Sequence, residues 1–110
     1  MMEINTEKTK TQMRKGILEM CILSIISKQN EAYVSDIIED LKAADMIVIE
    51  GTLYPLLTRL KNEKLLNYNW KESTSGPPRK YYELTDEGKI FLQEIVKTWQ
   101  ELQTMVNKII

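Results

Sequence analysis

A short helical pattern followed directly by two β-type segments constrains the fold of this chain more than any other feature. Leucines with the three- and four-residue spacing of a buried helical stripe predict a helix over residues 51–63: Leu53, Leu56, Leu57 and Leu60. Pro55 is expected in its first turn, where a missing N–H costs nothing. Segments 65–72 and 79–84 alternate apolar and polar residues across the turn-rich segment 73–78. This order predicts a helix followed by a β-hairpin.

Two further helical patterns precede this unit. The first, over residues 11–28, becomes apolar on almost every side after Gly16, which predicts burial by its own domain and by a partner subunit. The second covers residues 36–44, with Ser35 as its expected N-cap. Segment 46–49 is predicted to form a short β-bridge, and the polar residues 1–10 are predicted to be flexible.

A long helix is predicted from residue 85 to the C-terminus, with Thr85 as N-cap and two acidic residues in its first turn. Its apolar residues alternate at three- and four-residue steps: Leu92, Ile95, Trp99, Leu102, Val106 and Ile109. Such a seam on a long helix favours contact with a second copy of the chain. Packing against its own first helix is the alternative.

Composition excludes several classes of function. The chain of 110 residues has no histidine and one cysteine, so neither a zinc site nor the commonest general base is available. Its four scattered glycines form no phosphate-binding loop, and an enzyme, a cofactor or a metal is not expected. The lone Cys21 suits a reducing compartment, and the sequence shows neither a signal peptide nor a membrane span. We therefore expect a cytoplasmic protein.

Charge is distributed unevenly along the chain. The net charge is −1, but basic residues exceed acidic ones in segments 1–28, 50–64 and 71–80, whereas acidic residues dominate segments 29–49 and 81–110. The local field at a docking face matters more for nucleic acid than the total charge, because salt screens distant charges. The positive balance therefore falls on the N-terminus, the 51–63 helix and the hairpin.

These features predict an α+β, mostly α fold: a winged helix-turn-helix domain over 11–84 and a C-terminal dimerisation helix over 85–110. Such a domain places a helix in the major groove, grips phosphates and dimerises across two half-sites. The candidates for reading bases lie on the 51–63 helix: Thr52, Tyr54, Thr58 and Arg59. The candidates for gripping phosphates are basic: Lys15, Lys61, Arg79 and Lys80.

Each candidate also has a structural alternative. Arg59 has Glu63 four residues later as a possible partner on the helix surface. Tyr54 is also compatible with packing under the hairpin. The Arg79–Lys80 pair is also compatible with protecting a strand edge from aggregation, and Lys15 with being an ordinary solvated cation.

Two segments resemble the PadR family of bacterial transcriptional regulators: GTLYPLLTRL at 51–60, and GPPRKYYELTDEG at 76–88 following the Glu72-Ser73 pair. The resemblance spans residues 15–88. It implies a homodimeric repressor that reads a palindromic operator in double-stranded DNA with the 51–63 helix and grips the backbone with the 70–82 wing. By this similarity the recognition positions are Thr52, Tyr54, Pro55 and Thr58, and the wing positions are Gly76, Arg79 and Lys80. The single short C-terminal helix resembles that of the smaller subgroup.

The sequence departs from the family pattern at two positions. Lys64 stands where the family usually has a glycine after the recognition helix, at a cost on the order of 1 kcal/mol if that residue is left-handed. Val34 replaces a glycine at the start of the second helix. Neither residue belongs to the predicted DNA face.

Trp99 raises a second functional hypothesis. Some drug-sensing relatives of the family place a tryptophan at a similar position, where paired indoles bind a planar aromatic ligand. The resemblance implies that this chain has a pocket for such an effector, multidrug or phenolic, at the dimer interface, lined by Met13, Ile17, Ile95, Trp99 and Gln103. The alternative is a tightly packed interface without a cavity. A third hypothesis is a winged helix that serves protein contacts only.

Overall fold

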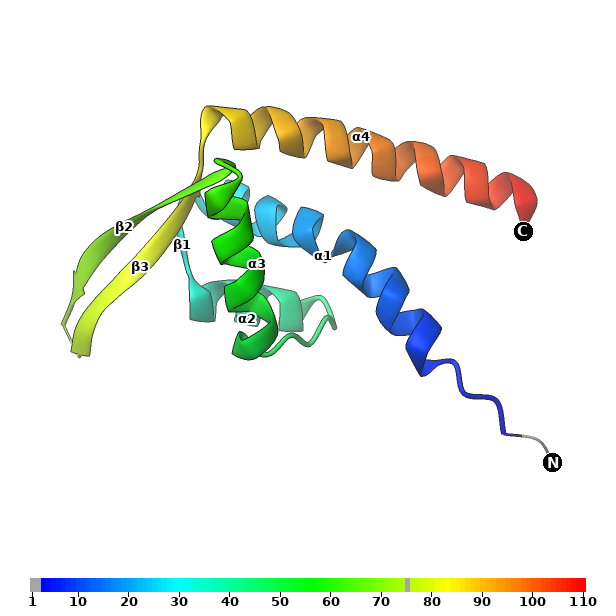
Figure 1. The fold of residues 1–110 in the computed structure, drawn as a ribbon, viewed down its shortest axis with the longest axis horizontal. Helices are drawn as coiled ribbons and strands as arrows, with labels where there is room; N and C mark the ends of the chain where they lie inside the picture. Colours follow the sequence, from blue (N-terminus) through cyan, green and yellow to red (C-terminus); the bar gives the residue numbers. More distant parts are fainter. Residues whose placement is uncertain (1–2, 75) are drawn as a thin grey trace.

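The apolar core lies where three helices converge on a small sheet (Figure 1). The computed structural model describes residues 3–74 and 76–110; residues 1 and 2, part of the segment expected to be flexible, and Ser75 lie outside. The elements in chain order are α1 (Glu7–Gln29), β1 (Ala32–Tyr33), α2 (Val34–Ala43), α3 (Glu50–Asn62), β2 (Leu66–Ser73), β3 (Gly76–Leu84) and α4 (Asp86–Ile109). The mostly helical α+β prediction is confirmed.

The helix of the 51–63 segment uses its leucine stripe as predicted. Leu53, Leu57 and Leu60 are completely buried, and Leu56 is partly buried at the edge of the core. They belong to one cluster with Ile22 of α1 and other aliphatic residues of α1 and α2. Burying each such side chain contributes roughly 1.5–3 kcal/mol, so this stripe fixes which face of α3 is left for solvent.

Pro55 is not in the first turn of α3, which corrects the sequence-based expectation. The helix begins at Glu50, one residue earlier than expected, so Pro55 is its sixth residue. A proline there has no N–H to donate to the carbonyl four residues earlier, which belongs to Gly51. The loss falls on the exposed side of the helix, where water can solvate that carbonyl, and the helix continues through it to Asn62.

The described strands form an antiparallel sheet in the order β1-β3-β2. The short strand β1, Ala32–Tyr33, pairs with Tyr82 and Tyr81 of β3. The β-bridge predicted at residues 46–49 is wrong. Residues 46–49 instead form the loop between α2 and α3. Ala32 is fully buried and pairs with the edge of β3 that β2 does not occupy. The sequence pattern near residue 32 gives no sign of this pairing, because β3 lies about 50 residues farther along the chain.

The hairpin of β2 and β3, hereafter the wing, has the predicted position, but β3 is longer than predicted because it begins at Gly76. Leu66 pairs with Leu84 at its base and Ser73 pairs with Gly76 at its tip, with an irregularity between Lys71 and Ser73. Pro77 and Pro78 therefore belong to β3 and not to the turn. The strand tolerates them because β1 pairs only at the far end of β3, which leaves that edge of the prolines without a strand partner among the described residues.

The first two helices both begin earlier than the sequence indicated. α1 starts at Glu7, not at residue 11, and the Asn5 side chain accepts a hydrogen bond from the Glu7 N–H (3.1 Å). α2 starts at Val34 with Tyr33 as its N-cap, so the expected Ser35 cap is wrong. Because β1 ends at Tyr33, the helix follows the strand without a spacer, and the Asp36 carboxylate accepts the Tyr33 N–H (3.2 Å).

The base of the wing is tied to the start of α4 by a small hydrogen-bond network. The Thr85 hydroxyl donates to the Lys64 carbonyl (2.7 Å) and accepts the Gly88 N–H (2.9 Å), which confirms Thr85 as the N-cap. Lys64 has φ 65°, a left-handed conformation that favours glycine. Its side chain costs on the order of 1 kcal/mol there, and the Thr85 bond helps to hold it.

α4 leaves the core and extends beyond the other elements (Figure 1). Its first half packs on α1, and Phe91 and Leu92 contact the core. Farther along, α1 and α4 diverge toward the two termini. Of the predicted seam, Leu92, Ile95 and Trp99 are partly buried, whereas Leu102, Val106 and Ile109 are 45%, 48% and 84% exposed. Packing against its own first helix therefore leaves half of the seam uncovered.

Candidate nucleic-acid interface

The polar face of α3 is open to solvent along its whole length. Thr52, Tyr54, Pro55, Thr58 and Arg59 are all exposed, opposite the buried leucines. Five of the predicted site residues therefore share one helix face, which is the arrangement that a helix needs to approach base edges in a groove.

A shallow groove follows this face. It is lined by Tyr54, Pro55, Thr58, Arg59, Asn62 and Glu63. Asn62 is a residue that the sequence interpretation missed. It lies four residues after Thr58, so the helical spacing that placed Thr58 on this face would have placed Asn62 there too. An exposed asparagine at this position has the donor and acceptor pair that recognises adenine in the major groove.

The wing presents its cations on two opposite faces. Because side chains alternate along a strand, Lys80 lies on one face of β3 and Arg79 on the other. The Lys80 ammonium lies over the rings of Tyr68 and Trp70, 4.4 Å and 5.4 Å from their centroids. The Arg79 guanidinium stacks 4.7 Å from the ring of Tyr33. Aromatic faces attract cations, so both side chains are oriented by aromatic residues of the neighbouring strands β1 and β2.

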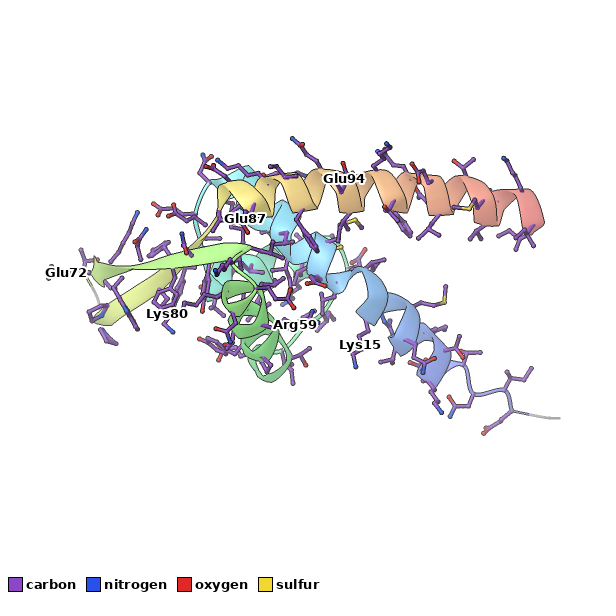
Figure 2. The ribbon with its side chains drawn as sticks, turned by 45° about the horizontal axis from the view of Figure 1, so that its top comes forward. Lys15, Arg59, Glu72, Lys80, Glu87 and Glu94 are labelled. Atoms are coloured by element: carbon purple, nitrogen blue, oxygen red, sulfur yellow. The ribbon has the colours of Figure 1, made fainter. Side chains whose placement is uncertain are left out.

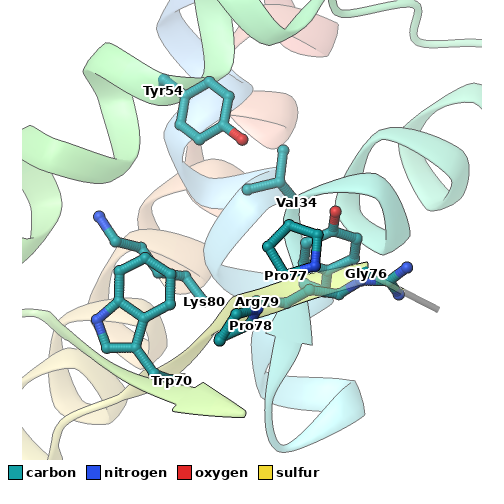
Figure 3. Close-up of a pocket in the computed structure, with 9 residues that line it drawn as sticks. Val34, Tyr54, Trp70, Gly76, Pro77, Pro78, Arg79 and Lys80 are labelled. Atoms are coloured by element: carbon teal, nitrogen blue, oxygen red, sulfur yellow. The ribbon is translucent and has the colours of Figure 1, made fainter. Parts of the chain in front are cut away.

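A cleft of about 420 Å³ separates α3 from the wing (Figure 3). Tyr54 borders it from α3, and Trp70 and Lys80 border it from the hairpin. Arg79, with the tip residues Gly76, Pro77 and Pro78, lines the other end, beside Tyr33 and Val34. The prediction that Tyr54 packs under the hairpin is thus met only in part, since the residue is 44% exposed and faces this cleft. Tyr33 and the 62% exposed Trp70 were missed.

The Tyr54 phenol remains protonated over an extended pH range. Its burial raises the pKa above the ordinary tyrosine value, and the nearby Glu50 carboxylate and Tyr33 phenol raise it further. A neutral phenol donates as well as accepts a hydrogen bond. Tyr54 therefore offers a donor at the boundary between the α3 groove and the wing cleft.

Lys15, the weakest sequence candidate, lies beside α3. It lines a groove of about 510 Å³ with Thr52 and Pro55. Figure 2 shows Lys15 on α1, on the side toward α3. Arg14 lines the same groove and was missed by the sequence interpretation; it also lies 3.9 Å from Glu7. α1 thus adds two cations beside the polar face of α3, away from the wing.

The other two basic candidates on α3 have partners outside their own helix. Arg59 pairs with Glu19 of α1 at 3.2 Å, so the pair predicted with Glu63 is wrong. The reason is tertiary: α1 packs beside α3 and presents a carboxylate that helical spacing within α3 cannot reveal. The Lys61 ammonium lies 5.3 Å from the Tyr68 ring centroid, which directs it toward the base of the wing.

The pattern of helix, wing and long terminal helix matches a known family. Residues 22–94 match the model of the transcriptional regulator PadR-like family. The chain belongs to the PadR family. Members of this family are transcriptional regulators. Within the described residues, no group of three potential metal ligands occurs, and no helix is long and apolar enough to cross a membrane.

Solved structures of the family resemble this chain along nearly its whole length. A PadR-like transcription factor from Bacteroides fragilis is 59% identical, with a TM-score of 0.78 over 94% of this chain and 99% of that one. A PadR family regulator from Eggerthella lenta is 34% identical, with a TM-score of 0.85 over 94% and 90% of the two chains. A PadR-like regulator from Bacillus cereus is 44% identical, with a TM-score of 0.77 over 89% and 95%.

In this PadR protein Trp99 borders two hollows between α4 and the helices beneath it. One, of about 310 Å³, is lined by Gly16, Ile17, Met20, Ile95, Thr98, Trp99 and Leu102. The other, of about 570 Å³, includes Cys21 and Ser24 on the opposite side of Trp99. Ile17, Ile95 and Trp99 of the predicted ligand pocket therefore come together. Met13 and Gln103 are exposed and do not line either hollow in the single chain.

Proposed function

We propose that this PadR-family protein is a homodimeric repressor that binds a palindromic DNA operator. In the proposed complex α3 enters the major groove, the wing contacts the adjacent backbone, and repression follows from occlusion of the promoter. The exposed half of the α4 seam supports the dimer. A two-fold dimer presents two α3 helices to two half-sites, which accounts for a palindromic site.

One observation carries this proposal: three neighbouring hollows lie along α3 and share lining residues. Tyr54 lines both the cleft beside the wing and the α3 groove. Pro55 lines both the α3 groove and the groove that contains Lys15 of α1. Cations flank this surface at both ends, with Lys80 at the wing and Lys15 on α1. A polar helix face between two basic flanks suits base contacts in a groove between two phosphate strands.

A gel shift on DNA upstream of the protein's own gene tests the proposal. The wild type is expected to shift the duplex, and Tyr54→Ala with Lys80→Ala is expected to weaken binding by roughly tenfold or more. Loss of Lys80 should also lower the salt dependence by about one phosphate contact. Arg79→Ala, measured separately, tests whether the other face of β3 also contacts DNA, because the Arg79 and Lys80 side chains lie on opposite faces of the strand.

The control is a substitution that removes one positive charge away from the proposed DNA-binding surface. Lys97→Ala lies on the exposed side of α4 and should leave binding unchanged. Equal losses in Lys97→Ala and in the Tyr54→Ala, Lys80→Ala variant would contradict an interface on α3 and the wing. If the folded wild type bound neither this DNA nor any duplex from a random-sequence selection, a winged helix for protein contacts would replace the repressor.

A second candidate function is the sensing of a planar aromatic effector, multidrug or phenolic. The hollow of about 310 Å³ beside Trp99 favours it, because an apolar space next to an indole is suited to a stacked ring. In a Trp70→Phe variant, which leaves Trp99 as the remaining tryptophan, planar aromatic cations or phenols are expected to quench the fluorescence. A Trp99→Phe variant that retains Trp70 should show little change. Unchanged Trp99 emission across a range of such ligands would refute the effector site.

A further inference from the structure

Arg59 differs from the other residues of the exposed polar face of α3, because its charge is already paired with a carboxylate. The guanidinium lies 3.2 Å from a Glu19 carboxylate oxygen across the boundary between α3 and α1. The Glu19 side chain is 26% exposed, whereas the Arg59 side chain is 51% exposed. The cation is thus the more exposed partner of the two and the more accessible to an approaching anion.

Arg59 also lines the α3 groove with Thr58 and Asn62. Figure 2 shows Arg59 on the side of α3 that faces α1. A phosphate that approached this groove would compete with Glu19 for one guanidinium. Ion pairs of this exposure are weak in water, so a DNA phosphate can displace the carboxylate, but only after the pair is broken.

We propose that Glu19 is a positioning residue that holds Arg59 back from the DNA backbone and so lowers the affinity for DNA. This inference rests on the proposed function. Glu19 does not touch DNA in this scheme; it acts through Arg59 alone. The groove keeps an arginine that contributes one phosphate contact when DNA replaces the carboxylate, and the cost of that exchange limits binding to all sequences alike.

Duplex titrations of the full chain test the proposal with wild type, Glu19→Gln, Arg59→Ala and the double variant. A fluorescent duplex of about 30 base pairs spans two half-sites, and both a mixed sequence and the upstream DNA are used. We expect Glu19→Gln to tighten binding by about three- to tenfold at low salt and to make the salt dependence steeper by about one contact. In the Arg59→Ala background the same change should have almost no effect.

Glu63→Gln provides the matched control. Glu63 lines the same groove as Arg59 and carries the same charge, yet the carboxylate paired with Arg59 is that of Glu19. An equal gain in Glu63→Gln and Glu19→Gln would overturn the proposal in favour of a general loss of negative charge. A gain from Glu19→Gln that persists without Arg59 would overturn it as well. Thermal melts check that the isosteric variants fold.

A measurement without DNA separates the role of Glu19 from the proposed function. The Arg59 side-chain N–H resonance of the free protein should move in Glu19→Gln and stay in place in Glu63→Gln. If the wild type binds DNA but Glu19→Gln binds no more tightly, Glu19 has no positioning role and the repressor remains. If the wild type binds no duplex at all, the repressor and the role of Glu19 both fail.

Discussion

Replacing Gly88 with alanine is expected to lower the free energy of unfolding by about 3 kcal/mol or more. A Cβ atom at Gly88 would lie 2.1 Å from the carbonyl oxygen of Leu65 and 3.3 Å from the Thr85 hydroxyl oxygen. The first contact is with backbone that accepts the Thr85 N–H at 3.1 Å, so it cannot move without breaking the junction. We expect a lower denaturation midpoint in urea and loss of the rigid joint between the wing and α4.

Gly16→Ala is the matched control for this change. Gly16 lies inside α1, and a Cβ atom there would meet nothing within 4 Å in the chain. Alanine is the better helix former by roughly 0.5–1 kcal/mol, so this variant should be slightly more stable than the wild type. Equal stability of Gly88→Ala and the wild type would show that the start of α4 is free to shift away from Leu65.

Replacing Val106 with glutamate is expected to dissociate the proposed dimer and to remove operator binding. Val106 is 48% exposed in the single chain, so its substitution should leave the fold intact. In a two-fold interface the change places two carboxylates in an apolar seam, at a cost of about 2–3 kcal/mol or more. The dimer dissociation constant should therefore rise by at least about 30-fold. Analytical ultracentrifugation measures the mass, and the upstream duplex measures binding.

Gln100→Glu gives the comparison for Val106→Glu. It adds the same charge to an exposed residue of α4 that is not part of the seam, and it should leave both the mass and the binding unchanged. Dimers in both variants would place the subunit contact away from the α4 seam. A monomeric Val106→Glu protein that bound DNA as tightly as the wild type would show that recognition does not require two subunits.

Features set by neighbouring residues were predictable. The leucine spacing of α3 left Thr52, Tyr54 and Thr58 on one exposed face, because a helical period of 3.6 residues determines both faces together. The Thr85 cap and the wing were also correct in kind, since caps and hairpins depend on residues close in sequence. The Arg59 partner was wrong, because Glu19 is distant in sequence and comes near only when α1 packs beside α3.

The sequence by itself determined the helical segments, the wing, the buried face of α3 and the family to which the chain belongs, since these depend on side-chain periodicity and short motifs. The tertiary structure alone decided that Tyr54 and Pro55 each border two of the three hollows along α3. It also decided that β1 closes the sheet and that Glu19 meets Arg59. Such contacts join residues far apart in the chain, and only the packing of the whole core brings them within reach.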